Sequence, residues 1–285
     1  MSIVVTGATG RLGRLVVDAL LDRGVDPAEV VATGRSVERL ADLADRGVRV
    51  EHFDFDAVPD TVPWLSADDV LLLVSGSEVG KRVPQHGAVI DLAARSGVRR
   101  LVYTSAPAAD DTTLIIAPEH AATEALVRES GLAFTFLRNG WYTENYQPSF
   151  EQARATGVVA ASAADARFAS APRSDFAEAA AVVLTTEGHD GAVYELSGDT
   201  TWDFAEFAAV AGEVLGREVV YRSLTPEEHR EALLAAGLDE GNAGFVVALD
   251  QDARAGLLAV TTGELGKLLG RPTVPLRDTL TSWSR

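Results

Sequence analysis

The chain of 285 residues contains no cysteine, which excludes disulfide bonds, thiolate catalysis and cysteine-ligated metal sites. Positive charge is scarce, because 25 lysines and arginines stand against 42 aspartates and glutamates and leave a net charge of −17. The summed field of such a chain repels phosphate groups. We therefore expect neither a nucleic acid nor an anionic membrane as a partner.

Long hydrophobic runs are also missing. No apolar run approaches the roughly 20 residues that cross a bilayer, although hydrophobic residues make up 47% of the chain, as in soluble globular proteins. The first predicted strand begins at residue 3, so we expect no signal peptide and a cytoplasmic location. A chain of this length suits one large α/β domain, alone or with a small appendage.

Two kinds of catalytic motif are absent. No pair of histidines has the spacing of a zinc motif such as His-Glu-x-x-His, so we predict no metal site. No Gly-x-Ser-x-Gly segment is present to place a hydrolase nucleophile on a strand-to-helix turn.

The most informative segment that is present is a glycine-rich turn. A β-branched run at 3–5 leads into Gly-x-x-Gly-x-x-Gly, and an amphipathic helix is predicted at 11–23. This order presents free backbone N–H groups and the positive end of a helix dipole to a pyrophosphate. The residues predicted to hold the phosphates of a dinucleotide are Gly7, Thr9, Gly10, Arg11, Leu12 and Gly13.

Alternating strands and helices extend this unit. Further strands are predicted at 30–33, 49–53, 69–75, 100–104 and 133–137, and helices at 37–46, 84–96 and 119–130. This alternation is typical of a Rossmann-type α/β fold, a doubly wound parallel sheet with helices on both faces. After a weakly patterned, alanine-rich stretch at 153–171, helices are predicted at 176–186, 204–215, 226–236 and 263–269, and strands at 192–196 and 218–221.

We expect two parts in this fold. A Rossmann domain for the dinucleotide is predicted at 1–150, rejoined by about 174–198, whose strand at 192–196 returns to the sheet. A smaller C-terminal α/β lobe for the substrate is predicted at 151–173 and 199–285. The lobe is expected over the carboxyl edge of the sheet, where ligands bind in such folds.

The end of the second strand indicates which dinucleotide binds. An NAD site usually carries Asp or Glu there to hold the ribose 2′-hydroxyl, but this strand ends in Thr33-Gly34-Arg35 with no acid. A guanidinium is always charged and suits a 2′-phosphate, so we predict NADPH as the cofactor, with Arg35 as the residue that selects it. Asp54 and Phe55, after the third strand, are expected to line the adenine.

Three more strand ends are expected to meet near the nicotinamide. After the fourth and fifth strands, the residues predicted to flank it are Ser75, Gly76, Ser77, Glu78, Thr104 and Ser105. After the sixth strand, the residues predicted to bind the substrate are Asn139, Trp141, Tyr142 and Asn145. Aromatic and amide side chains suit a planar ring. The alternative to substrate binding is that Trp141 and Tyr142 only pack the lobe against the sheet.

No catalytic residue stands out. His86 and His120 lie near the starts of two predicted helices, and either could donate a proton near neutral pH. Tyr142 is a third candidate, from the aromatic stretch after the sixth strand.

The chain resembles a known family. Residues 6–13, together with Arg35, 75–85 and 137–146, resemble the NmrA-like branch of the atypical short-chain dehydrogenases and reductases. The segments 77–86 and 138–146 are similar to bacterial NADPH-dependent quinone oxidoreductases, and the similarity extends to 193–199 and 268–273. The resemblance implies hydride transfer from NADPH to a quinone.

One departure bears on the chemistry. Typical short-chain reductases use Tyr-x-x-x-Lys, in which the lysine lowers the pKa of the tyrosine that protonates the substrate. His120 and Glu124 hold those places here, and an acid raises a neighbouring pKa. Ordinary ketone reduction is therefore not expected. A quinone still fits, because its reduced anion is far less basic than an alkoxide, and positioning the rings does most of the work.

Two other functions remain open. A dinucleotide-binding redox sensor that acts through a protein partner would also lack the Tyr-x-x-x-Lys pair. A tailoring reductase acting on an aromatic polyketide or another enone would suit the same aromatic loop. No exposed seam or heptad indicates an oligomeric state.

Overall fold

The computed structural model describes residues 1–285. Its central feature is a parallel sheet of 7 strands in the order β3-β2-β1-β4-β5-β6-β8. The strands are β1 (Ile3–Val5), β2 (Val30–Gly34), β3 (Arg49–His52), β4 (Val70–Leu73), β5 (Arg100–Ser105), β6 (Phe134–Asn139) and β8 (Val193–Leu196). The predicted Rossmann-type sheet is confirmed, and the order reverses between β1 and β4, where such sheets bind their ligands.

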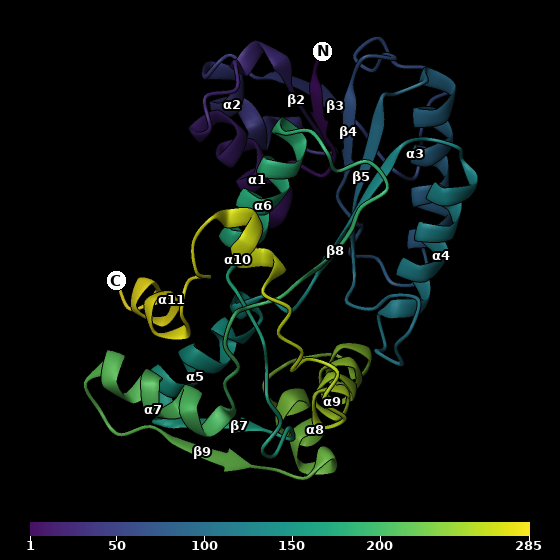
Figure 1. The fold of residues 1–285 in the computed structure, drawn as a ribbon. Coiled ribbons are helices and arrows are strands. Elements are labelled where there is room, and N and C mark those ends of the chain that lie inside the picture. The colour runs from purple at the N-terminus through teal and green to yellow at the C-terminus, as the bar shows by residue number, and fades with distance from the viewer.

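Helices cover both faces of the sheet (Figure 1). On one face lie α1 (Arg11–Asp22), α6 (Arg173–Thr185) and α10 (Glu264–Leu269), and on the other α3 (Arg82–Ser96) and α4 (Ala117–Glu129). The short α2 (Ala41–Asp45) follows a 3-10 turn at Val37–Leu40, and another 3-10 turn spans Pro27–Glu29. Burial follows helical spacing: in α1, Leu12, Val16 and Leu20 face the core.

A second group of elements gathers at one end of the sheet (Figure 1). It contains a parallel pair of strands, β7 (Val158–Ala161) and β9 (Val220–Ser223). Its helices are α5 (Gln147–Thr156), α7 (Phe204–Leu215), α8 (Pro226–Ala235), α9 (Glu240–Arg254) and α11 (Leu276–Trp283), with a 3-10 turn at Thr143–Tyr146. These elements share a core of their own, rich in aromatic rings such as Phe168, Trp202 and Phe207.

The strand predicted at 192–196 rejoins the sheet as β8, beside β6. That pairing and the separate aromatic core support the two-part division, whose boundaries stay a prediction. Several elements were not predicted. The stretch 153–171 holds the end of α5 and all of β7, and α9 and α11 escaped notice. In α9 only Ala243, Asp250 and Ala253 are buried, so its apolar periodicity is weak.

Membrane-spanning helices are missing from the fold: none of its helices combines the length and the apolar character needed to cross a bilayer.

Candidate active site

A cleft of about 550 Å³ lies at the carboxyl ends of β1, β2 and β4. Most of the residues predicted to bind the dinucleotide line it: Gly7, Thr9, Gly10, Arg11, Leu12, Gly13, Arg35, Asp54, Phe55, Ser75, Gly76, Ser77 and Glu78. The parallel sheet explains this convergence, because the loops after its strands all emerge at one edge. Whether each side chain contacts a cofactor stays a prediction.

The glycine turn fits a pyrophosphate closely. A Cβ on Gly13 would lie 2.5 Å from the carbonyl oxygen of Gly7, and a Cβ on Gly34 would lie 2.7 Å from the side chain of Thr9. Gly7 itself has φ +62°, which side chains rarely adopt. Helix α1 begins after Gly10 with no side-chain cap and no acid in its first turn. Its first N–H groups are therefore free to bind an anion.

Arg35 does not stand alone in the cleft. Its Nη1 lies 3.4 Å from Oε1 of Glu78, whose other oxygen lies 2.9 Å from Nζ of Lys81. The sequence interpretation placed Glu78 beside the nicotinamide; Glu78 lines the cleft in contact with Arg35, and its place beside a nicotinamide stays a prediction. A 2′-phosphate would take the place of this carboxylate on the guanidinium.

The loop after β4 is held by buried side chains. The N–H of Gly76 donates to Nε2 of His86 at 2.9 Å, and its carbonyl oxygen accepts from Nε of Arg82 at 2.6 Å. Nδ1 of His86 lies 3.0 Å from the hydroxyl of Thr123. Burial lowers the pKa of His86 to about 4, and the charge of Arg82 adds to this. The expectation that His86 donates a proton near neutral pH is wrong: its Nε2 is an acceptor that shapes the loop.

His120 is corrected in the same way. Its side chain is buried in α4 and does not line the cleft, and its Nδ1 lies 2.8 Å from the hydroxyl of Tyr103. Burial, with the charge of Arg82, lowers the pKa of His120 to about 3. The imidazole is therefore neutral near pH 7 and serves no substrate as an acid. The tyrosine place of Tyr-x-x-x-Lys is occupied by a core residue.

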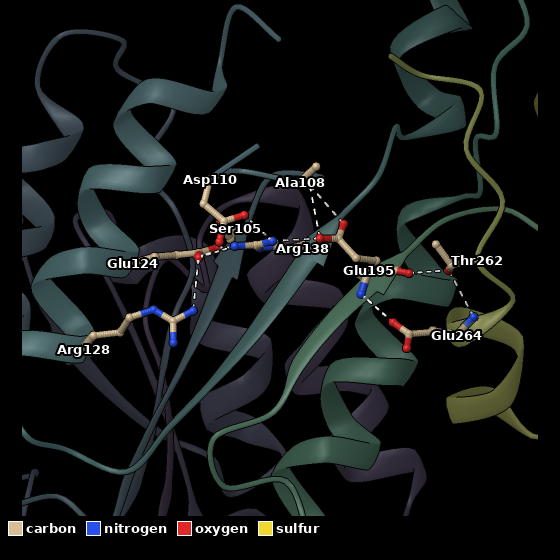
Figure 2. Close-up of polar contacts among 9 residues, drawn as sticks. All are labelled: Ser105, Ala108, Asp110, Glu124, Arg128, Arg138, Glu195, Thr262 and Glu264. Atoms are coloured by element: carbon tan, nitrogen blue, oxygen red, sulfur yellow. Dashed lines mark hydrogen bonds and ion pairs between the residues drawn. The ribbon is translucent and has the colours of Figure 1, made fainter. Parts of the chain in front are cut away.

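Glu124, at the position of the lysine in Tyr-x-x-x-Lys, forms a buried ion pair with Arg138 (Figure 2). Nε and Nη2 of Arg138 donate to the two oxygens of Glu124 at 2.9 and 2.7 Å. Nη1 of Arg138 lies 2.9 Å from both Asp110 and Glu195. Ser105 donates to Glu124 at 2.7 Å. The prediction that Ser105 flanks the nicotinamide is therefore wrong, because its hydroxyl points into this network and does not line the cleft.

Thr104 is also misplaced by the sequence interpretation. Its side chain is buried, and its hydroxyl accepts the N–H of Ser75 at 2.8 Å. Thr104 does not line the cleft. It positions the loop that does.

A second cavity, of about 620 Å³, lies between the carboxyl edge of the sheet and the second group of elements. Arg11 lines both cavities. The predicted substrate residues are divided between them: Trp141 and Asn145 line the second cavity, and Tyr142 lines the cleft. The remaining wall is largely aromatic and aliphatic, and it includes Tyr146, Phe168, Phe204, Phe245, Val246, Leu249 and Leu258.

Two of the predicted substrate residues have other contacts. Asn139 is buried, lines neither cavity and donates from Nδ2 to the hydroxyl of Tyr142 at 3.2 Å, so the structure contradicts its place in the acceptor pocket. The ring of Tyr142 packs edge-on against Phe176, and the guanidinium of Arg173 lies 4.5 Å from its centroid. Burial raises the pKa of Tyr142, which makes its hydroxyl a weaker acid.

Sequence reasoning missed several residues of these walls. In the cleft they are Gly34, Phe53, Val74, Arg82, Gln85 and Arg173. In the second cavity, the missed residues come from the segment 144–151, from α8 and α9, and from the separate positions Ala161, Phe168, Phe204 and Leu258. A helix N-terminus at Arg173, directly after Pro172, was a usable signal for one of them. The others belong to segments far apart in the chain, with no motif to join them.

Comparison with known proteins decides the family. Residues 7–187 match the model of an NAD(P)H-binding family, and the chain is 39% identical to quinone oxidoreductase 2 of Escherichia coli strain K12 over 98% of this chain and 97% of that one. The chain belongs to the NAD(P)H-binding, NmrA-like family. A (4-alkanoyl-5-oxo-2,5-dihydrofuran-3-yl)methyl phosphate reductase of Streptomyces griseus is 32% identical over 97% of this chain and 95% of that one.

Solved structures of family members agree with the fold. An NADPH-dependent quinone oxidoreductase of Escherichia coli, in complex with NADPH, superposes with a TM-score of 0.94 at 38% identity, covering 99% of this chain and 100% of that chain. A triphenylmethane reductase of Citrobacter sp., complexed with NADP(H), superposes with a TM-score of 0.90 at 33% identity and covers 100% of both chains. The glycine turn and Arg35 fit the same kind of cofactor here.

Proposed function

We propose that this protein is an enzyme that transfers a hydride from NADPH to a quinone or a similar planar conjugated carbonyl acceptor. The observation that carries the proposal is the junction of the two cavities. A cleft that fits a dinucleotide shares Arg11 with a cavity whose walls are largely aromatic and aliphatic. An acceptor ring in that cavity lies next to the cofactor cleft, and the related quinone oxidoreductase of Escherichia coli supports this choice of substrate.

The chain contributes binding and positioning. The glycine turn and the start of α1 hold the pyrophosphate, and Arg35 binds the 2′-phosphate. When bound, NADPH supplies the hydride. The walls of the second cavity, Trp141 and Phe245 among them, exclude water and hold a flat ring in one orientation, which removes much of the entropic cost of reaction. His120 and Glu124 lie outside both cavities, so no Tyr–Lys chemistry takes place there.

A second substrate class has a specific observation in its favour. The relative from Streptomyces griseus reduces a conjugated dihydrofuranone by its name, and a cavity of about 620 Å³ has room for more than one ring. An enone or an aromatic polyketide would take hydride in the same place. The sensor alternative finds less support, because a protein that only binds the dinucleotide needs no apolar cavity beside it.

The decisive experiment follows NADPH oxidation by absorbance with a panel of quinones, with enones, and with simple ketones as controls. Rapid oxidation with quinones and none with ketones is the expected result. Turnover with enones alone would favour the tailoring reductase. Tight binding of NADPH without turnover of any acceptor would favour the sensor and overturn the proposal.

The Arg35→Glu variant tests the cofactor. Loss of charge-assisted hydrogen bonds to the 2′-phosphate, with a repelling carboxylate in their place, should weaken NADPH about a hundredfold, since such bonds contribute about 1.5–3 kcal/mol. NADH carries no 2′-phosphate, so its affinity should change by less than about threefold. Arg39→Glu is the matched control, because Arg39 is exposed, carries the same charge and does not line the cleft. Equal losses for NADPH and NADH would contradict the role of Arg35.

The Gly13→Ala variant tests the phosphate-binding turn. The new Cβ would lie 2.5 Å from the oxygen and 2.8 Å from the carbonyl carbon of Gly7, so backbone of the turn must move. Overpacking of this kind costs about 1–3 kcal/mol, and we expect NADPH to bind about ten- to a hundredfold more weakly by titration. Gly244→Ala is the control, because nothing lies within 4 Å of its added Cβ in α9. Unchanged NADPH affinity in Gly13→Ala would place the phosphates elsewhere.

The composition adds two further parts to the proposal. We propose a cytoplasmic location, and we propose that the protein acts on a small molecule and not on a nucleic acid. The net charge of −17 supports the second statement, because it disfavours a phosphate backbone.

A further inference from the structure

One corner of the second cavity holds a hydrogen-bonded cluster of three buried side chains, of which His229 and Asp250 line the cavity. Ser162 directly follows β7, His229 lies in α8 and Asp250 lies in α9. Their residues are 0%, 6% and 6% exposed. Both the backbone N–H and the hydroxyl of Ser162 donate to Oδ2 of Asp250 at 2.8 Å, and Nδ1 of His229 lies 3.0 Å from the same oxygen.

This arrangement fixes the histidine ring. The backbone N–H of Ser162 lies 3.2 Å from Nδ1 of His229 but only 2.8 Å from Oδ2 of Asp250, so we assign this N–H to the carboxylate. A carboxylate only accepts hydrogen bonds, so Nδ1 of His229 then carries a hydrogen and donates it to Oδ2 of Asp250. Nδ1 also lies 3.1 Å from the hydroxyl of Ser162, and every contact of the ring with this cluster runs through Nδ1. The opposite nitrogen, Nε2, is left for the cavity, which His229 and Asp250 both line.

The surroundings make this corner stand out. His229 shares the cavity with apolar side chains, among them Phe245, Val246 and Leu249 on the neighbouring helix. Cavities that bind small molecules are typically apolar with a few polar groups that fix the orientation of the ligand. When Nε2 carries a proton as well, the carboxylate beside Nδ1 compensates the positive charge of the ring.

We propose that His229 is a catalytic residue whose Nε2 binds an oxygen of the acceptor and protonates it. The inference rests on the proposed function. Hydride from NADPH and a proton from Nε2 together convert the quinone into the hydroquinone: the acceptor gains two electrons, NADPH becomes NADP⁺, and the imidazolium becomes neutral imidazole. Solvent then restores the proton on Nε2. Asp250 and Ser162 are positioning residues, since they act through the ring.

Other titratable and charged groups lie around this cluster and the cavity, and they also affect the pH dependence of kcat. Burial raises the pKa values of Tyr146 and Tyr221, and the charge of Asp250 adds a smaller effect in the same direction. The cavity wall also carries the charged side chains Arg11, Glu144 and Glu151. None of these is a second imidazole.

Two substitutions at His229 separate its roles. His229→Asn places an amide nitrogen near the position of Nδ1 and so keeps the bond to Asp250, but it removes the group that reaches the cavity. We expect its kcat to fall about ten- to a hundredfold and its KM for quinone to rise. His229→Gln keeps a donor near the position of Nε2 that is no acid, so we expect near-normal KM with reduced kcat.

The pH profile of kcat is the readout that a structural role would not change. In the unsubstituted protein kcat should decline as the pH rises and Nε2 loses its proton, and in His229→Gln that decline should disappear. Ser162→Ala, which leaves the ring in place, should keep it, and His52→Gln, at an exposed histidine, should match the unsubstituted protein throughout. A His229→Asn variant with unchanged kcat, KM and pH profile would overturn the proposal.

A binding measurement keeps the two proposals distinct. Imidazole resonances are followed by NMR while a naphthoquinone is added to the complex with NADP⁺, and the resonance lost in His229→Asn identifies His229. A shift at Nε2 of His229, with none at His52, is expected. If no quinone is turned over but this shift occurs, the proposed reduction fails and the binding role of His229 stands. If quinone is reduced and the shift is absent, the inference on His229 fails alone.

Discussion

Replacing Arg138 by Met is expected to lower the free energy of unfolding by about 3–5 kcal/mol, the usual cost of removing one partner from a buried ion pair. The guanidinium is the centre of the network in Figure 2, with Glu124, Asp110 and Glu195 around it. Side chains of Arg138 and Glu124 are only 7% and 3% exposed. Without the cation, Glu124 is left as a charge in the core and three carboxylates face one another.

Urea unfolding of the variants at neutral pH measures this effect. Arg128→Met is the matched control, because Arg128 approaches the same carboxylate at 3.9 Å but is 45% exposed, and exposed pairs contribute about 0–1 kcal/mol. The double variant Glu124→Leu/Arg138→Met should recover much of the loss, since it also removes Glu124, the most deeply buried of the three carboxylates that pair with Arg138. A loss below about 1 kcal/mol in Arg138→Met would show that the network contributes little.

The same network accounts for the acid at the lysine position of the Tyr-x-x-x-Lys motif. Glu124 accepts hydrogen bonds from Arg138 and Ser105, so it ties α4 to β5 and β6. Glu195 extends the connection, since its N–H donates to Glu264 in α10 at 2.6 Å. A residue in the place of a catalytic lysine thus joins helices on both faces of the sheet.

Lowering the pH from 7 to 5 is expected to destabilise the fold by about 4 kcal/mol through His86 and His120. Their pKa values in the folded protein are about 4 and about 3, against 6.5 for an unconstrained histidine. Above pH 6.5 both rings are neutral whether the chain is folded or not, so their stabilising effect is complete. Below it the unfolded chain binds two protons that the folded protein resists, at about 1.4 kcal/mol per pH unit for each.

Urea unfolding at several pH values between 7 and 5 gives the slope of the free energy of unfolding against pH. The slope should steepen as the pH falls and correspond to about two protons near pH 5. His120→Leu should remove about one of them, whereas His52→Gln should leave the slope unchanged, because His52 is exposed. A free energy of unfolding that stays constant over this range would contradict the burial of both rings in neutral form.

Acid should also weaken the cofactor site. Nε2 of His86 accepts the N–H of Gly76, and a protonated imidazole has no acceptor. Protonation therefore releases the loop after β4, which lines the dinucleotide cleft. Stability and the shape of the cleft depend on the same neutral ring.

Local sequence was sufficient for the sheet and for most of the cofactor cleft. The glycine turn, the β2 end at Arg35 and the loop at Ser75 each follow a strand directly, and strands and helices alternate with clear hydrophobic periodicity. A parallel sheet then brings the ends of its strands to one edge. The end of β5 differs from the other strand ends. Thr104 and Ser105 also lie at the carboxyl end of a strand, but their hydroxyls contact Ser75 and Glu124.

The sequence by itself determined the fold and the dinucleotide turn, and it predicts Arg35 as the residue for a 2′-phosphate, because each depends on residues close together in the chain. Tertiary structure alone decided which side chains are buried as neutral or paired groups and which line the second cavity. His86 and His229 look alike as isolated histidines in the sequence. His86 accepts from Gly76, while His229 contacts Asp250 directly and lines the second cavity. Both rings are buried, and their difference arises from partners ten or more residues away in the chain, which no local pattern contains.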